Sequence, residues 1–268
     1  MFTLSSMYRF PLKSGTPEPL QRAEIDELGM KDDRRWLLVD AATGRFLTQR
    51  LLPEIGRIQV DWPDASTVRF RAPGMPDLYV AIPDEAAELI GITVWKDSIL
   101  AFAAGAQADD WVSAFLQRAC RLVHMPLERA RQIDLAYAEP GQRVNFADGF
   151  PLLLIGQASL EDLEAKVGRA LGMLRFRPNL VVTGSEPYAE DTWTRIRMGQ
   201  IEFQVAKPCS RCIITTLDPL TGERSADREP LATLKGYRLQ EGGIMFGQNL
   251  IPLGQGPIEV GMDVEVLA

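Results

Sequence analysis

The stretch KPCSRCIITTLDPLTG, residues 207–222, is the most distinctive part of this sequence, and the assignment of a fold depends on it. It places two thiols, Cys209 and Cys212, three residues apart, with Lys207 and Arg211 close by. Positive charge beside a thiol favours the thiolate form, which is a nucleophile and a ligand for soft metals. Taken alone, the pair is equally compatible with a redox dithiol or with two half-buried apolar side chains.

Short apolar runs bounded by turn residues accompany this stretch, and such runs are typical of β-strands. They are residues 150–155, 179–183, 199–205 and 212–217. The final residues, GPIEVGMDVEVLA (256–268), alternate polar and apolar side chains around Gly261, which predicts a pair of strands. The second half of the chain is therefore predicted to be rich in β-structure.

Two segments predict helices. Asp109–Cys120 spaces Trp111 and Phe115 four residues apart and begins with acidic residues, which the helix dipole favours. A second helix is predicted to begin at Ser159, where SLED has the pattern of a capping box. Cys120 falls on the apolar side of the first helix, so we expect it in the core.

The first 94 residues consist mostly of short apolar stretches broken by turns, and they predict a β-rich first half. Within them, residues 36–49 (WLLVDAATGRFLTQ) have the pattern of a hairpin in which Gly44 supplies a positive φ. We expect Trp36 in the core. Arg50, which follows the hairpin, either faces a pocket or caps the turn.

The composition narrows the possible functions. A chain of 268 residues with 46% hydrophobic residues can bury a large core, and its net charge of −7 argues against a general nucleic-acid-binding surface. The single histidine, His124, lies in an apolar segment and is expected to be structural, which disfavours His-dependent catalysis and Cys/His zinc sites. Neither GxGxxG nor GxxxxGK[ST] occurs. Without a secretory signal or an apolar run of roughly 18 residues, we expect a soluble, cytoplasmic protein with no membrane partner.

Motifs in both halves of the chain resemble one family. CSRCIITTLDPLTG (209–222) resembles the C-terminal part of MOSC proteins, named after the molybdenum cofactor sulfurase C-terminal domain. Further motifs along most of the chain resemble the same family: YRFPLKS (8–14), DRRWL (33–37), FLTQR (46–50), RFRPN (175–179), YAED (188–191) with Trp193, REPL (228–231), LK (234–235), YR (237–238) and FGQ (246–248). Their order along the chain makes the likeness more specific than the cysteine pair alone.

Within that family, the sequence is most similar to the mitochondrial amidoxime-reducing component and bacterial reductases of N-hydroxylated compounds. The resemblance implies an α+β fold built mainly from antiparallel strands. Residues 1–120 would form an N-terminal MOSC-associated, β-barrel-like domain, and residues 121–268 a MOSC-type β-barrel with flanking helices. The cofactor would lie in the crevice between them.

The resemblance also implies a molybdenum cofactor, Mo-molybdopterin, with Cys212 as the catalytic thiolate that binds the metal. Arginine suits the phosphate of such a cofactor because its guanidinium group can donate two hydrogen bonds at once. Cys209 is expected nearby without binding metal. Asp191 is a catalytic candidate, although an acidic residue in such a loop could equally stay solvated. The cofactor-binding positions fall on Lys13, Ser14, Arg34, Arg177, Asn179, Ser210, Arg211 and Cys212.

The implied activity is the reduction of N-hydroxylated or N-oxygenated compounds such as hydroxylamines, amidoximes and hydroxylated nucleobases. Some bacterial relatives carry a ferredoxin domain with clustered cysteines, and this sequence has no such cluster. We therefore expect a separate electron-donor protein: a ferredoxin, a flavin reductase or a cytochrome. Two alternatives remain, namely a non-catalytic carrier of the cofactor or of sulfur, and a redox protein that uses Cys209 and Cys212 as a dithiol.

Overall fold

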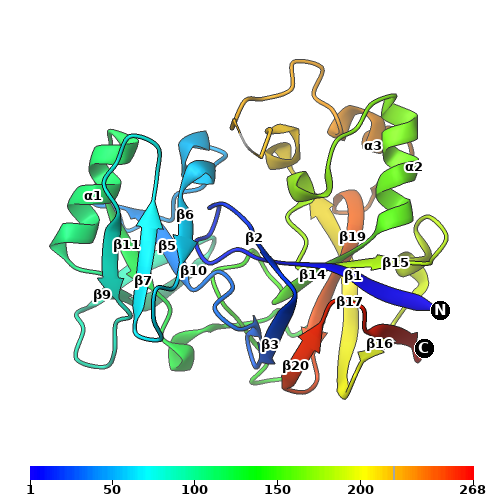
Figure 1. Cartoon of the computed structure of the whole chain (residues 1–268), viewed down its shortest axis with the longest axis horizontal. Coiled ribbons are helices and arrows are strands. Elements are labelled where there is room, and N and C mark those ends of the chain that lie inside the picture. The colour runs from blue at the N-terminus through cyan, green and yellow to red at the C-terminus, as the bar shows by residue number, and fades with distance from the viewer. Residues whose placement is uncertain (220) are drawn as a thin grey trace.

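The computed structural model describes residues 1–219 and 221–268, so Leu220 of the cysteine motif lies outside the described residues. Strands dominate the described part, which also contains three α-helices and several short 3-10 helices (Figure 1). Nearly all strand pairs are antiparallel. The predicted α+β class is confirmed.

Seven strands of the described chain close into a barrel. Their hydrogen-bonded order is β14–β15–β1–β21–β16–β17–β19, and β19 pairs with β14 to complete the circle. Only the β14–β15 pair in this circle is parallel. The bounds are β1 (Phe2–Arg9), β14 (Leu152–Gly156), β15 (Leu180–Thr183), β16 (Arg195–Met198), β17 (Ile201–Arg211), β19 (Gly243–Pro252) and β21 (Asp263–Val266).

Apolar side chains that alternate along the barrel strands fill its interior. Leu152 and Leu154 on β14, like their counterparts on β16, are buried two residues apart, as the period of a strand requires. On β1 the buried residues Leu4 and Met7 are three apart, because a bulge between Leu4 and Ser6 shifts the register. Burial of each such large side chain contributes roughly 1.5–3 kcal/mol to folding.

Smaller sheets lie beside the barrel (Figure 1). One orders β5 (Trp36–Asp40), β11 (Cys120–His124), β10 (Asp97–Ala103) and β9 (Leu89–Val94), and another joins β6 (Gln59–Asp61), β7 (Thr67–Arg71) and β8 (Leu78–Ala81). Helix α1 (Ala106–Leu116) shares their core with Trp36 and Phe70. His124 lies against Trp36, with ring centroids 4.6 Å apart, and burial lowers its pKa to about 4.

The predicted hairpin after β5 is confirmed, with Val39 bridging Phe46. Gly44 has φ +66°, and a Cβ atom there would lie 2.8 Å from the carbonyl oxygen of Gly91. Position 44 therefore accepts glycine for reasons of both backbone angle and space.

The remaining elements connect and flank these sheets. Helices α2 (Gln157–Val167) and α3 (Leu231–Tyr237) lie beside one another next to the barrel (Figure 1). No helix in residues 1–219 and 221–268 is long and apolar enough to cross a bilayer. The other elements are β2 (Glu18–Leu20), β3 (Arg22–Asp26), β4 (Gly29–Met30), β12 (Arg131–Gln132), β13 (Arg143–Val144), β18 (Leu239–Gln240), β20 (Gly256–Glu259), η1 (Pro53–Arg57), η2 (Leu127–Arg129), η3 (Met173–Phe176), η4 (Ala189–Thr192) and η5 (Ile213–Thr216).

Four local predictions need correction. The helix predicted over Asp109–Cys120 is α1, Ala106–Leu116, so Cys120 is buried as expected but lies at the start of β11 and not on the helix. Residues 212–217 are not a strand: they contain η5, because the backbone N–H and hydroxyl of Thr215 both donate to the carbonyl of Cys212. The helix predicted to begin at Ser159 begins at Gln157. The strands on either side of Gly261 exist but do not pair with each other, since β20 pairs with β3 and β21 with β1 and β16.

The first strand joins the two ends of the chain. β1 pairs with β15 and β21, so residues 2–9 belong to a barrel whose other strands all come after residue 150. The boundary proposed near residue 120 stays a prediction. The topology brings the segment that follows β1 to the same place as the cysteine motif at the end of β17.

Candidate functional site

A cleft lies between the barrel and the smaller sheets, at the end of β17. Its empty space amounts to about 800 Å³, part of it open to solvent. Asp191 does not line it. All eight predicted cofactor-binding residues do: Lys13, Ser14, Arg34, Arg177, Asn179, Ser210, Arg211 and Cys212.

Three of these residues hold an unusual backbone conformation. Ser14, Arg34 and Arg177 have φ values of +70°, +48° and +55°, in the left-handed region that non-glycine residues rarely adopt. Hydrogen bonds hold them there: for example, the backbone N–H of Arg34 donates to Phe10 at 2.7 Å. Strain of this kind is retained mainly at functional sites, where it aims side chains at a ligand.

The cleft is strongly cationic. Lys13, Arg34, Arg50, Arg177 and Arg211 all line it, whereas Asp148 is the one carboxylate among its described lining residues. On a protein of net charge −7, this concentration of positive charge is local. Such an arrangement favours a multiply charged anion such as a phosphate group.

Several guanidinium nitrogens in the cleft have no partner. Arg50 Nε, Arg177 Nη2 and Arg211 Nε are buried and lack a hydrogen-bond acceptor in the described part of the chain. Buried polar groups are rarely left this way in a folded protein. Oxygen atoms of an anionic ligand are acceptors of the kind that these nitrogens lack.

Burial acts on two of the cations. Burial, together with the nearby charges of Arg34 and Arg211, lowers the pKa of Arg177 to about 9. It also lowers the pKa of Lys13 to about 8, although the carboxylate of Asp148 opposes this shift. The charged forms of both groups are therefore disfavoured in the cleft, and a bound anion would stabilise them.

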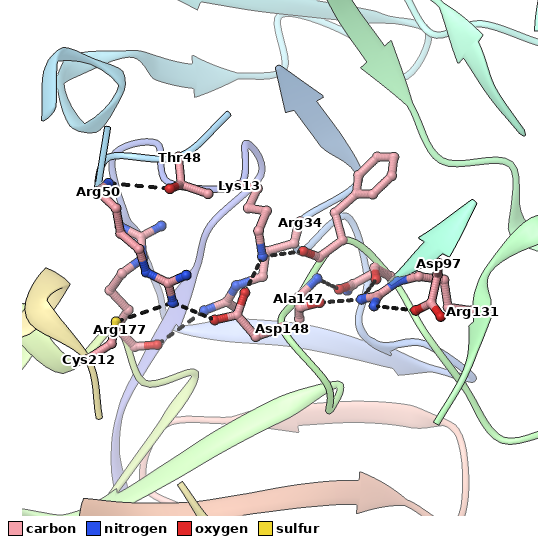
Figure 2. A network of polar contacts seen from close by, with 12 residues as sticks. Lys13, Arg34, Thr48, Arg50, Asp97, Arg131, Ala147, Asp148, Arg177 and Cys212 are labelled. Atoms are coloured by element: carbon pink, nitrogen blue, oxygen red, sulfur yellow. Dashed lines mark hydrogen bonds and ion pairs between the residues drawn. The ribbon is translucent and has the colours of Figure 1, made fainter. Parts of the chain in front are cut away.

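Asp148 lies at the centre of the polar network in Figure 2. Lys13 Nζ donates to Asp148 Oδ1 at 2.5 Å, and Arg50 Nη2 lies 3.6 Å from Oδ2. The cleft walls screen part of the Asp148 carboxylate from bulk water, which would raise its pKa, but the charge and hydrogen bond of Lys13, with the charges of Arg50 and Arg34, outweigh this and hold the pKa well below its usual range. With 59% of its side chain exposed, Asp148 remains an accessible carboxylate.

Each thiol of the cysteine motif contacts its own arginine. Arg50 Nη2 donates to Cys212 Sγ at 3.3 Å, and Arg211 Nη1 donates to Cys209 Sγ at 3.1 Å. Both cysteines are free and half-buried. Cys209 packs against the cluster that contains Phe176, whereas Cys212 sits at the end of β17 with Arg50 across the cleft. The question left open for Arg50 is thereby answered, because it faces the cleft.

Asn179 and Ser210 fix the walls of the cleft. Asn179 is buried, and its Oδ1 accepts hydrogen bonds from Arg34 Nη1 at 3.1 Å and from the backbone N–H of Leu153 at 3.2 Å. Ser210 Oγ donates to the carbonyl of Gly242 at 3.2 Å. Asn179 thus ties the strained Arg34 to the barrel.

Asp191 lies on η4, away from the cleft. Gln248 Nε2 donates to its Oδ1 at 2.6 Å, and Arg238 Nη2 lies 2.6 Å from its Oδ2. Gln248 belongs to β19 and pairs with Pro208 of β17, directly before the cysteine motif. Asp191 is therefore placed to brace the strands that carry the cysteines.

The neighbouring residue, Glu190, forms a second brace. Its carboxylate is buried and accepts hydrogen bonds from the backbone N–H of Gly156 at 3.0 Å and from Ser159 Oγ at 2.8 Å. Burial raises its pKa, although these hydrogen bonds oppose the shift. We call Glu190, Gly156 and Ser159 the carboxylate brace. It holds the beginning of α2 against η4.

Sequence reasoning missed Asp148 and left Arg50 undecided. The signal for Asp148 was weak: one acidic residue in NFADGFP, directly before the buried strand β14. Its importance appears only when residues 13 and 50 are brought beside it. In the described residues, no three His, Cys, Asp or Glu side chains gather in a way that could hold a metal ion.

The donor groups of the cleft match the cofactor that the sequence implies. Cys212 offers one soft sulfur ligand, while the arginines and Lys13 offer charged donors for a phosphate. The three unpartnered guanidinium nitrogens supply donors that no protein group uses. The residues present therefore fit a phosphate-bearing pterin with a thiol-bound metal.

Comparisons with known proteins agree with one another. Residues 1–119 match the MOSC N-terminal beta barrel domain and residues 141–265 match the MOSC domain. The chain is 34% identical to mitochondrial amidoxime-reducing component 1 of Mus musculus over 99% of its length and 82% of that protein, and 32% identical to mitochondrial amidoxime reducing component 2 of Homo sapiens over 88% and 72%. It is also 30% identical to molybdenum cofactor sulfurase of Oryza sativa subsp. japonica, over 91% of this chain and 32% of that protein.

Proposed function

Because this chain belongs to the MOSC-domain family that includes the mitochondrial amidoxime-reducing components, we propose that it is a molybdenum-cofactor-dependent reductase of N-hydroxylated compounds. The observation that carries the proposal is the cleft itself, where Cys212 lies among five cationic side chains, three of which have an unpartnered guanidinium nitrogen. The names of the relatives support the reaction class.

In the proposed reaction, R–NH–OH takes up two electrons and two protons to give R–NH2 and water. The N–O bond breaks, and its oxygen leaves in the water molecule. When bound, the cofactor would supply two-electron redox chemistry at its metal. The protein's part is to bind and orient the cofactor and to hold the substrate beside it.

We assign the anionic part of the cofactor to Lys13, Ser14, Arg34 and Arg177. Ser14, Arg34 and Arg177 line the cleft with a positive φ. Arg177 Nη2 has no acceptor and can donate a hydrogen bond to the cofactor. Asn179, Ser210 and Arg211 would line the rest of the cofactor. Cys212 would bind the metal, with Arg50 Nη2 holding its Sγ in place.

Asp148 is the group we assign to the substrate. Since Lys13 and Arg50 keep it ionised, it cannot act as a general acid near neutral pH, but it can accept a hydrogen bond from the N–H or O–H of a hydroxylamine or amidoxime. Its exposure within the cleft leaves it accessible to a small molecule. We propose that electrons come from a separate protein: a ferredoxin, a flavin reductase or a cytochrome.

Asp191 contributes indirectly in this proposal. It touches neither the cleft nor Cys212, and its contacts are with Arg238 and Gln248. We therefore assign it a positioning role, acting through β19 on the neighbouring strand β17.

The decisive experiment measures molybdenum by elemental mass spectrometry in protein from a host that makes the pterin cofactor, together with amidoxime reduction by a reduced viologen dye. We expect near-stoichiometric molybdenum and activity, both lost in Cys212→Ser and both kept in the matched control Cys209→Ser. Molybdenum without reduction would instead favour a cofactor carrier. Absence of molybdenum, with equal loss of function in both variants, would favour a dithiol protein.

A further inference from the structure

We propose that the β9–β10 hairpin carries the docking surface for the electron-donor protein, and that this donor presents an acidic face. The inference rests on the proposed reductase function, which takes its electrons from another protein. The surface, here called the hairpin face, consists of six exposed side chains: Trp95, Leu100, Leu127, Arg45, Lys96 and Arg129.

Three large apolar side chains are exposed on the hairpin face. Trp95 is 40% exposed, Leu100 38% and Leu127 44%. Leu100 and Arg129 line one open groove, so the end of η2 lies beside β10 on this surface. Exposed apolar patches mark interaction sites, and Trp and Arg are both enriched among the residues that contribute most to binding at protein interfaces.

The charge of the hairpin face is opposite to that of the whole protein. Arg45, Lys96 and Arg129 are exposed, and no carboxylate of the described residues lies within 4 Å of their side-chain nitrogens. Glu128 is the one carboxylate among the described residues that line the groove. On a protein of net charge −7, these three cations make a local positive surface, which attracts an acidic partner and orients the encounter.

The turn at the tip of the hairpin is strained. Trp95 has φ +57°, which a bulky residue seldom adopts. Two contacts hold it there: its ring lies 5.0 Å from that of Phe46, and Arg50 Cζ lies 4.8 Å from its centroid. The fold therefore maintains a partly exposed tryptophan in a fixed orientation, which is what an interface anchor requires.

Two routes connect the hairpin face to the cleft. In the first, Arg50 joins the ring of Trp95 to Cys212 Sγ, which lies 3.3 Å from Arg50 Nη2. In the second, shown in Figure 2, Asp97 pairs with Arg131 at 3.2 Å. Arg131 in turn donates to the carbonyl of Ala147, next to Asp148. A donor that covers Trp95 would sit one side chain away from the proposed metal ligand, which keeps the path for electrons short.

The test uses full-length protein and two acidic one-electron donors, a plant-type ferredoxin and a flavodoxin, with the dissociation constant measured by calorimetry at low ionic strength. The variant is the triple charge reversal Arg45→Glu, Lys96→Glu and Arg129→Glu. Its matched control reverses three other exposed cations, Arg22→Glu, Lys31→Glu and Lys235→Glu, which changes the net charge by the same amount. Thermal unfolding checks that both variants are folded.

We expect at least one donor to bind the wild type, and the hairpin variant to bind it about tenfold more weakly than the control variant does. Trp95→Ser should weaken binding by about tenfold as well. If the two triple variants lost equal binding affinity, the effect would come from net charge alone, and the proposal would be overturned. Binding of neither donor to the wild type would overturn it as well.

Reduction of an amidoxime by a reduced viologen dye separates this proposal from the reductase function. Dye molecules need no docking surface, so the hairpin variant should keep wild-type activity with the dye while losing it with the protein donor. If the wild type shows no activity with the dye, the proposed function fails, and the binding measurement still decides whether the hairpin face attracts an acidic protein.

Discussion

The cleft and the carboxylate brace both place charged groups away from water, but they treat those groups in opposite ways. In the brace, one carboxylate, that of Glu190, accepts hydrogen bonds from the backbone of Gly156 and the hydroxyl of Ser159. In the cleft, like charges lie close together, and guanidinium nitrogens of Arg50, Arg177 and Arg211 lack acceptors.

This difference in hydrogen bonding distinguishes charged groups that stabilise the fold from charged groups that are suited to bind a ligand. Complete hydrogen bonding makes a buried charge tolerable, whereas repulsion and unpaired donors make it destabilising until a partner arrives. Substitution should therefore harm stability in the brace and ligand binding in the cleft.

Arg177→Ala should produce the largest effect, and it should fall on the cofactor. Loss of a buried donor to an anionic group is expected to weaken cofactor retention by about thirtyfold or more, roughly 2 kcal/mol. The free energy of unfolding of the cofactor-free protein should change by less than about 1 kcal/mol, because Arg34 and Arg211 no longer repel a buried charge. Molybdenum content and thermal unfolding measure the two quantities. A large loss of stability with the cofactor retained would show that Arg177 stabilises the fold and does not bind the cofactor.

Glu190→Ala should show the opposite pattern. It leaves the Ser159 hydroxyl and the Gly156 N–H buried without an acceptor, which is expected to lower the free energy of unfolding by about 2–3 kcal/mol and the melting temperature by roughly 5–10 °C. Ser159→Ala, the matched control within the brace, should cost about 1 kcal/mol. A fully stable Glu190→Ala protein would show that the brace does not hold α2.

The two regions should also respond to pH with opposite signs in the cofactor-free protein. The pKa of Glu190 is raised by burial, so above about pH 4.5 the folded state binds more protons than the unfolded state. The stability of the wild type relative to Glu190→Gln should therefore fall as pH rises through the folded pKa.

The pKa of Lys13 is lowered from 10.5 to about 8, so between these values the unfolded state binds more protons. Relative to Lys13→Gln, wild-type stability should rise across that window by something on the order of 2 kcal/mol. Denaturant unfolding at several pH values measures both slopes, and slopes of the same sign would contradict the assignment.

The sequence predicted the parts of the fold that follow from local pattern. The apolar runs of β14, β15 and β17 and the glycine at position 44 are visible in the residues themselves. The start of α2 was misplaced because Ser159 has the composition of a cap but uses its hydroxyl on Glu190, 31 residues away. A local motif carries no information about such a distant partner.

The site divides in the same way. Lys13, Arg177 and Cys212 were predicted as site residues because each lies in a motif that resembles the family, and all three line the cleft. Asp148 was missed and Arg50 left undecided because their positions depend on contacts across the cleft: Arg50 lies against both Asp148 and Cys212. Those contacts exist only once the barrel and the smaller sheets are assembled.

Asp191 is the residue for which motif and geometry disagree most, and Asp191→Asn should have the smallest effect on activity. Asparagine keeps an oxygen that can accept a hydrogen bond from Gln248, so β19 should stay in place. It loses the negative charge that faces Arg238, so the contact with Arg238 should weaken. We expect kcat/KM with a viologen donor to fall by about threefold or less, with molybdenum retained, because Asp191 does not line the cleft. The matched comparison is Asp148→Asn, which removes the one carboxylate of the described cleft lining and should cost at least about tenfold more. If Asp191→Asn lost as much activity as Asp148→Asn at full molybdenum content, Asp191 would have to reach the reacting atoms during turnover, and its place on η4 would be that of a catalytic residue.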